Sequence, residues 1–164
     1  MGQWDQGLKQ LVRAAPQDFD SLVLPGAVLV KEVPTELLSR AIRMDTLHEV
    51  QFNGEPMLLH LEFQKKSDPE MGQRLLEYNM IGMLTYHLPV WSCVFYLVPV
   101  KTVETPWNCT LPGGQEVVSF HFRVIKLWEL SVDDLLKTGH AGLYPLLPLT
   151  RDGRRTEVVE RSIT

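Results

Sequence analysis

The sequence predicts a mixed α/β fold, with a mixed central sheet flanked by helices. Three observations predict it. Residues 59–64 alternate apolar and polar side chains, which is the two-residue period of a strand. Residues 70–87 carry a broad apolar stripe at helical spacing. Residues 90–100 form a continuous apolar run, which is typical of a strand buried on both faces. Strands and helices that alternate in this way build one sheet with a helix packed across it.

Length and composition favour a single domain over residues 1–164. The net charge of −4 argues against a protein that coats nucleic acid non-specifically, because such proteins carry a basic stripe. The N-terminus lacks a basic region followed by an apolar core, and no apolar run reaches the ~18 residues of a membrane span. We therefore expect a cytoplasmic protein without a membrane partner. Cys93 lies in an apolar run and is expected to be a core thiol, and Cys109 has no CxxC partner.

The N-terminal segment predicts short elements: a helix at 3–13, one turn at 18–24, a strand at 27–33 and a helical turn at 35–38. A hairpin follows, because Asn53 and Gly54 separate two extended runs. Glu55 and Pro56 come next and predict a turn slightly longer than two residues. This hairpin folds Asp45 back towards the far end of the second strand.

The remaining elements are predicted from their end signals and periodicity. Asp68 is placed to cap the helix at 70–87, and Pro89 ends it. Residues 107–115 are rich in proline and glycine and predict a loop, whereas residues 117–127 alternate and predict one strand. Ser131 is expected to cap a short helix that runs to residue 137, and residues 139–150 are expected to be irregular.

Carboxylates that the hairpin brings together predict a metal site. Hard divalent cations such as Mg²⁺ bind one or two carboxylates together with water and phosphate oxygens. Asp45 and Glu62 supply such a pair. Gln64 shares the strand face of Glu62, where its amide would orient water or phosphate without carrying charge. The backbone carbonyl of Phe63 is a further candidate ligand.

The order of these residues resembles a known family, the recombination-promoting nuclease (Rpn) and transposase-like group of the PD-(D/E)XK nuclease superfamily. The resemblance covers about residues 4–149 and rests on order and spacing, since each motif alone is weak. The matching residues are Asp5 with Lys9, then Asp45, then Leu61, Glu62, Phe63 and Gln64, then Met71, Arg74, Leu75, Leu76, Glu77 and Tyr78, and finally Leu88, Pro89 and Val90.

The resemblance implies a restriction-endonuclease-like core and hydrolysis of DNA phosphodiesters that depends on Mg²⁺ or Mn²⁺. In the family's pattern Asp45 and Glu62 match the metal-binding acids. Gln64 stands where most of the superfamily has Lys, which orients the attacking water. Lys66 lies two residues after Gln64 and would share its strand face. It is therefore a candidate to replace that Lys if the strand extends to residue 66.

Three more residues are candidate substrate contacts: Arg74, expected to neutralise a phosphate, together with Tyr78 and Lys9. The chain ends abruptly at Thr164, so we expect a C-terminal extension to be lacking. A homodimer is compatible with this interpretation, and the oligomeric state is left open.

Simpler interpretations stand beside these. Asp45 is alternatively a turn carboxylate, Glu62 part of a solvated strand face, and Gln64 a plain polar residue. Arg74 and Tyr78 are as well explained by packing as by substrate contact. His60 is interpreted as a hydrogen-bonded sheet residue and not as a ligand. The whole chain is alternatively a nuclease-fold module that binds nucleic acid or a protein without cutting, as the missing Lys and the acidic charge suggest.

Overall fold

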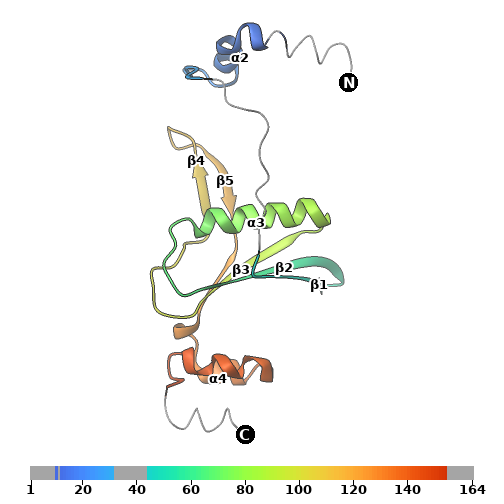
Figure 1. Ribbon diagram of the computed structural model, residues 1–164, viewed down its shortest axis with the longest axis vertical. Coiled ribbons are helices and arrows are strands. Elements are labelled where there is room, and N and C mark those ends of the chain that lie inside the picture. Colours follow the sequence, from blue (N-terminus) through green and yellow to red (C-terminus); the bar gives the residue numbers. More distant parts are fainter. Residues whose placement is uncertain (1–9, 11, 32–43, 155–164) are drawn as a thin grey trace. The chain divides into compact units, whose positions relative to one another are not determined.

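The computed structural model describes residues 10, 12–31 and 44–154 and divides the chain into two compact units, 1–41 and 42–164 (Figure 1). The predicted single domain is not tested by this division. Most of the predicted first helix, and the turn at 35–38, lie outside the described residues. The first unit contains helix α2, Pro16–Val23. Proline suits the first turn of a helix, and Pro16 begins α2.

Residues 27–31, which we predicted to begin a strand, are irregular. The side chain of Gln17 explains this conformation. Its Nε2 donates to the carbonyl of Ala27 at 2.8 Å, and its Oε1 accepts from the backbone N–H of Leu29 at 2.7 Å. These backbone groups therefore find their partners in an α2 side chain instead of in a neighbouring strand.

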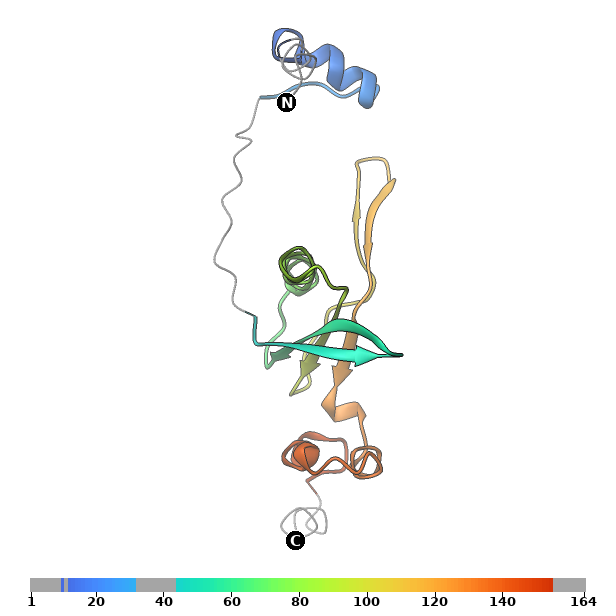
Figure 2. The same ribbon diagram turned by 90° about the vertical axis from the view of Figure 1, so that its right-hand side faces the viewer.

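The second unit is built on a four-stranded sheet in the order β1-β2-β3-β6. Strand β1, Thr46–Phe52, pairs antiparallel with β2, Glu55–Gln64. Strand β3, Val90–Tyr96, runs parallel to β2 and to β6, Arg123–Lys126. Helix α3, Met71–Tyr86, connects β2 to β3 and lies along one face of the sheet (Figures 1 and 2). The predicted mixed α/β class, hairpin and long helix are confirmed.

The turn of the hairpin is shorter than predicted. Phe52 pairs with Glu55, which leaves only Asn53 and Gly54 between the strands. Their φ angles of 52° and 83° are both positive, as the commonest two-residue hairpin turn requires. Pro56 belongs to β2 and pairs with Gln51 of β1, but pairing with β3 begins only at Leu58, so Pro56 is tolerated at the unpaired start of the strand.

Two loop and strand predictions are corrected by a second, two-stranded sheet. Strand β4, Trp107–Thr110, occupies half of the predicted loop and pairs with β5, Glu116–Phe120. The predicted strand at 117–127 breaks into β5 and β6. Thr105 accounts for the break, because its Oγ1 accepts from the Phe122 N–H at 3.2 Å and donates to the Phe122 carbonyl at 3.1 Å.

Helix α3 buries only part of the predicted apolar stripe, which comprises Met71, Leu75, Leu76, Met80, Met83 and Leu84. Met71 and Leu75 are buried as expected, but Met80 and Leu84 are 41% and 67% exposed. The remaining buried positions are small or polar: Gly72, Asn79 and Gly82. A Cβ at Gly72 would overlap the indole of Trp107, so glycine there allows close packing. The buried cluster under α3 consists of Met71, Leu75, Val94, Tyr96, Phe120 and Phe122.

The described chain ends in short helical segments: η1 Leu127–Glu129, α4 Val132–Leu136 and η2 Ala141–Leu149. The predicted cap is confirmed: Ser131 Oγ accepts from the Asp134 N–H, and the Asp134 carboxylate accepts from the Ser131 N–H. The hydrogen bond from the Ser131 N–H to the charged carboxylate lowers the pKa of Asp134. None of the helices among the described residues has the length and apolar character needed to cross a membrane.

Candidate functional site

The polar face of β2 is the buried face. Leu58, His60, Glu62 and Gln64 pair in register with Val90, Ser92, Val94 and Tyr96 of β3. His60 is 0% exposed and Glu62 2% exposed. This burial overturns the simpler interpretation of Glu62 as part of a solvated strand face. The polar residues of the alternating strand therefore lie inside the protein.

Asp45 and Glu62 come together as predicted. Thr46 pairs with Leu61, so the next position places Asp45 beside Glu62. The backbone N–H of Asp45 donates to Glu62 Oε1 at 3.3 Å. In return, the N–H of Phe63 donates to Asp45 Oδ2 at 3.2 Å. Two carboxylates are thus held at one end of the hairpin by reciprocal backbone hydrogen bonds.

His60 connects Glu62 to the interior. Its Nε2 lies 3.0 Å from Glu62 Oε1, and its Nδ1 lies 3.2 Å from Ser92 Oγ. Asn79 of α3 donates from Nδ2 to Ser92 Oγ at 3.1 Å and to the Val90 carbonyl at 2.7 Å. The buried histidine has a partner on each ring nitrogen, which agrees with its predicted role as a hydrogen-bonded sheet residue.

Arg74 and Tyr78 border the same site from α3. Arg74 Nη1 forms a 2.6 Å ion pair with Asp68 Oδ2, and Nη2 lies 3.9 Å from Glu62 Oε2. The Arg74 Cζ atom lies 5.9 Å from the Tyr78 ring centroid. The Tyr78 ring packs edge-on against His60 with centroids 5.5 Å apart. All of these contacts of Arg74 and Tyr78 are with other residues of the chain. Their contact with substrate therefore stays a prediction.

Opposing effects act on the pKa of Arg74. Burial lowers it, whereas hydrogen bonding and charge attraction from Tyr78 and Asp68 raise it, and the net result is a pKa above the ordinary value. Arg74 therefore carries a positive charge beside Glu62 at every pH of interest. This charge offsets part of the cost of burying the Glu62 carboxylate.

The other predicted residues have different positions. Gln64 shares the buried face of Glu62 and is half-buried. The side chain of Phe63 points to the opposite face and stacks on Phe95 at 5.2 Å. Lys66 is exposed and lies beyond Gln64, where β2 ends, so the parity argument for Lys66 does not apply. Lys9 and Asp5 lie outside the described residues.

The donor set fits a hard divalent cation held by few protein ligands. Within the described ranges no three His, Cys, Asp or Glu side chains form a group that could hold a metal ion. Two adjacent carboxylates match the usual Mg²⁺ arrangement, in which water and phosphate oxygens complete the coordination. Glu62 Oε1 lies within hydrogen-bonding distance of the Asp45 N–H and of His60 Nε2, whereas Oε2 has no hydrogen-bond partner among the described residues and lies 3.9 Å from Arg74 Nη2. Oε2 would therefore be the oxygen of Glu62 left to bind a cation.

Sequence reasoning missed two buried residues that are linked to Glu62 through His60, namely Ser92 and Asn79. Ser92 lies in an apolar run that hides its pairing with His60. Asn79 of α3 is a second such residue, and it is 7% exposed. A signal existed for Asn79, since it lies four residues after Leu75 and so shares the buried face. The prediction that Asp68 caps the helix is wrong, because Glu70 is the N-cap of α3 and no side chain caps it. Asp68 instead accepts from the Glu70 N–H at 2.9 Å and forms the ion pair with Arg74.

Comparisons with protein-family models, with curated proteins and with solved structures found no match for this chain. The functional interpretation therefore rests on the site itself and on the motif resemblance.

Proposed function

We propose that this chain is a metal-dependent DNA endonuclease of the recombination-promoting nuclease and transposase-like type, with a restriction-endonuclease-like core. The observation that carries the proposal is the juxtaposition of Asp45 and Glu62 at the end of the β1–β2 hairpin. The mixed sheet crossed by α3 is compatible with such a core. DNA is proposed as the substrate class because the order of motifs from Asp45 to Tyr78 resembles that nuclease family.

The Asp45 and Glu62 carboxylates would hold Mg²⁺ or Mn²⁺. A bound ion of this kind activates water and offsets charge on a phosphate oxygen. The remaining work falls to the chain's own residues. Gln64, two residues beyond Glu62 on the same face, hydrogen-bonds the attacking water or a phosphate oxygen. Arg74, fixed by its 2.6 Å pair with Asp68, supplies positive charge next to the scissile phosphate.

Replacing the usual Lys by Gln64 is expected to slow cleavage. Lys carries a charge that stabilises negative charge developing in the transition state, and an amide supplies only a dipole. Loss of one such stabilising group costs about 10²–10³ in rate. Gln64→Lys should therefore raise the cleavage rate if the chain cuts DNA.

The test is nicking of supercoiled plasmid with Mg²⁺ or Mn²⁺. Glu62→Gln and Asp45→Asn preserve side-chain shape and should abolish cleavage. Glu55→Gln, an exposed substitution in the same strand, is the matched control and should cut as wild type does. Thermal melting establishes that each variant is folded. Equal cleavage by wild type, Glu62→Gln and Asp45→Asn would refute the proposal.

A second candidate is a nuclease-fold protein that binds nucleic acid or a protein partner without cutting. It is favoured by the burial of Glu62, whose side chain is 3% exposed and already accepts a hydrogen bond from Asp45. Calorimetric titration with Mn²⁺ separates the two candidates. Carboxylate-dependent binding at millimolar metal supports the nuclease. Absence of any such binding, with the fold intact, supports the binding module.

A further inference from the structure

The hydrogen bonds behind Glu62 form a continuous buried line from α3 through β3 to β2. It runs Asn79, Ser92, His60 and Glu62, with consecutive distances of 3.1, 3.2 and 3.0 Å. His60 and Ser92 are each 0% exposed. We propose that this line is an ordered relay in which His60 is a positioning residue for the Glu62 carboxylate. The inference deepens the proposed function and, in its metal-binding consequence, rests on it.

The donor directions along the relay follow from the chemistry at each end. The Asn79 Nδ2 group is a donor, and it gives hydrogen bonds to Ser92 Oγ and to the Val90 carbonyl. Ser92 Oγ therefore accepts from Asn79 and has one proton of its own to donate. His60 Nδ1, at 3.2 Å, is the acceptor that receives this proton.

At the other end a carboxylate oxygen can only accept. Glu62 Oε1 lies 3.0 Å from His60 Nε2, so Nε2 must carry the proton. A neutral imidazole has one N–H, and both neighbours assign it to Nε2. The opposite tautomer would place two acceptors 3.0 Å apart at Glu62 and leave the Ser92 hydroxyl proton without an acceptor. Each unmet group of this kind is costly inside a protein.

The relay fixes which carboxylate oxygen is available. Glu62 Oε1 accepts from His60 Nε2 and from the Asp45 N–H. The carboxylate is thereby held with Oε2 towards Arg74, at 3.9 Å. Partners that orient a metal-binding side chain are worth about 10–100-fold in metal affinity. Disrupting the relay should thus weaken metal binding although no ligand is removed.

The first test reads the tautomer directly and needs neither metal nor DNA. The ¹⁵N resonances of the imidazoles are recorded for metal-free protein, and His60 is assigned by the loss of its signals in His60→Gln. We expect a protonated Nε2 and an unprotonated Nδ1. Ser92→Ala removes the donor to Nδ1 but keeps the Glu62 acceptor, so Nε2 should stay protonated and only the Nδ1 resonance should move. A wild-type His60 protonated on Nδ1, or on both nitrogens, would overturn the relay.

The second test compares two substitutions that differ in where the amide donor lies. Glutamine places its amide nitrogen close to the position of His Nε2, whereas asparagine places it close to Nδ1. His60→Gln should bind Mn²⁺ within a few-fold of wild type, and His60→Asn about 10–100-fold more weakly. His48→Asn, an exposed position of β1, is the control and should bind as wild type does. Thermal melting reports the stability of each variant.

The two proposals fail in different ways. Equal Mn²⁺ affinity of His60→Gln, His60→Asn and wild type would refute the positioning role while leaving the nuclease proposal intact. If His60→Asn does not fold, Ser92→Ala takes its place and should lower the affinity several-fold, with unchanged affinity as the contrary result. No Mn²⁺ binding by wild type would refute the nuclease proposal, and the tautomer measurement would then decide the relay alone.

Discussion

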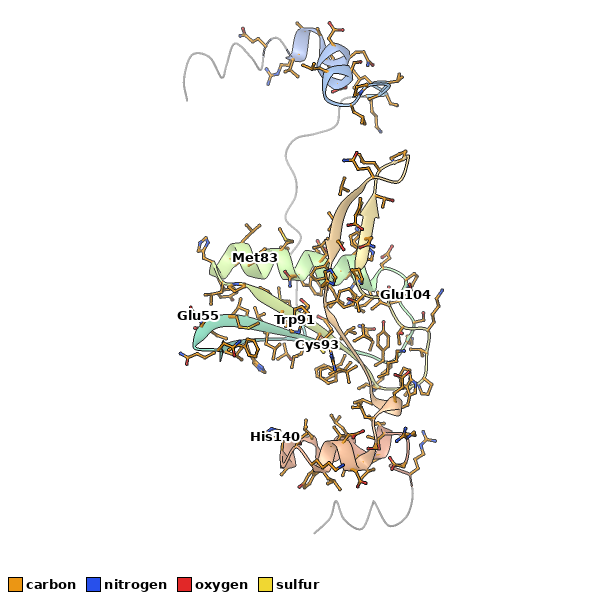
Figure 3. The ribbon with its side chains drawn as sticks, turned by 180° about the vertical axis from the view of Figure 1, so that it is seen from behind. Glu55, Met83, Trp91, Cys93, Glu104 and His140 are labelled. Carbon is orange, nitrogen blue, oxygen red and sulfur yellow. The ribbon has the colours of Figure 1, made fainter. Side chains whose placement is uncertain are left out.

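The two faces of the β2–β3 pair differ in both chemistry and burial. The face under α3 contains polar groups that are almost fully buried, including His60 and Glu62. The opposite face is largely apolar, yet Phe63 and Trp91 are each 42% exposed there. Cys93 lies on that same face of β3 and is 4% exposed (Figure 3). Hydrophobicity and burial are therefore uncoupled in this part of the sheet.

The difference between the faces shows that a buried polar row is stable when every member has a partner. In the described part of the chain no buried side-chain nitrogen or oxygen lacks a hydrogen bond. Such a network is more demanding than an apolar core, because one missing partner leaves the others unsatisfied. Because such a network is demanding, we expect the one beneath α3 to have a role in the function of the protein. Substitutions on each face can test this contrast.

The largest effect on stability is expected where α3 packs on the face of the β2–β3 pair that it covers, which we call the covered face. Leu75 is 0% exposed, so Leu75→Ala should lower the free energy of unfolding by about 2–5 kcal/mol. Leu84 on the same helix is 67% exposed, and Leu84→Ala should change it by less than about 0.5 kcal/mol. Urea denaturation of both variants measures the difference. Similar losses would contradict the observed burial of α3.

The two cysteines should differ in reactivity. Burial raises the pKa of Cys93 to about 11, against a smaller lowering by Arg123. The folded protein therefore keeps Cys93 as an unreactive thiol near neutral pH. Cys109 is exposed and should react with a thiol reagent at once. Cys93 should react only after unfolding, and Cys93→Ser provides the reference for assigning the two phases.

The same pKa shift has a consequence for stability. The unfolded chain releases the Cys93 proton near the ordinary thiol pKa of 9.0, whereas the folded protein retains it up to about 11. In that window the unfolded state binds fewer protons, so the Cys93 contribution makes stability fall as pH rises. Below this window the contribution is constant. Comparing the pH dependence of unfolding for wild type and Cys93→Ser isolates it.

Asn79 provides a test of the covered polar row. Asn79→Leu removes the donor to Ser92 and to the Val90 carbonyl and should destabilise the protein by about 1–3 kcal/mol. Met80→Leu, at the next and 41% exposed position, should change stability by less than about 0.5 kcal/mol. Thermal unfolding compares them. A neutral Asn79→Leu would show that the buried row does not depend on α3.

The smallest effect on stability is expected on the open face, which is the face of the sheet opposite α3. Phe52 is 64% exposed at the end of β1, and threonine is a good strand residue. Phe52→Thr should therefore change the free energy of unfolding by no more than about 0.5 kcal/mol. The measurement is again urea denaturation. A loss comparable to that of Leu75→Ala would mean that the open face is covered in solution.

Local signals in the sequence predicted several features well. The Asn53 and Gly54 pair predicted the hairpin, and with it the meeting of Asp45 and Glu62, because a tight turn sets the register of both strands. Ser131 predicted the capped helix α4 for a similarly local reason. The strand at 117–127 was predicted wrongly, since its break depends on Thr105, which is distant in sequence.

The sequence by itself determined the alternation of β2, the hairpin and the pairing of two carboxylates, since these depend on backbone geometry over a few residues. Only the tertiary structure decided which face of β2 is buried. Alternation with period two states that the faces differ, but it does not state which one a helix covers. That choice depends on Ser92, which is the partner of His60 Nδ1, and on Asn79, which donates to Ser92. With these partners His60 and Glu62 can be buried together.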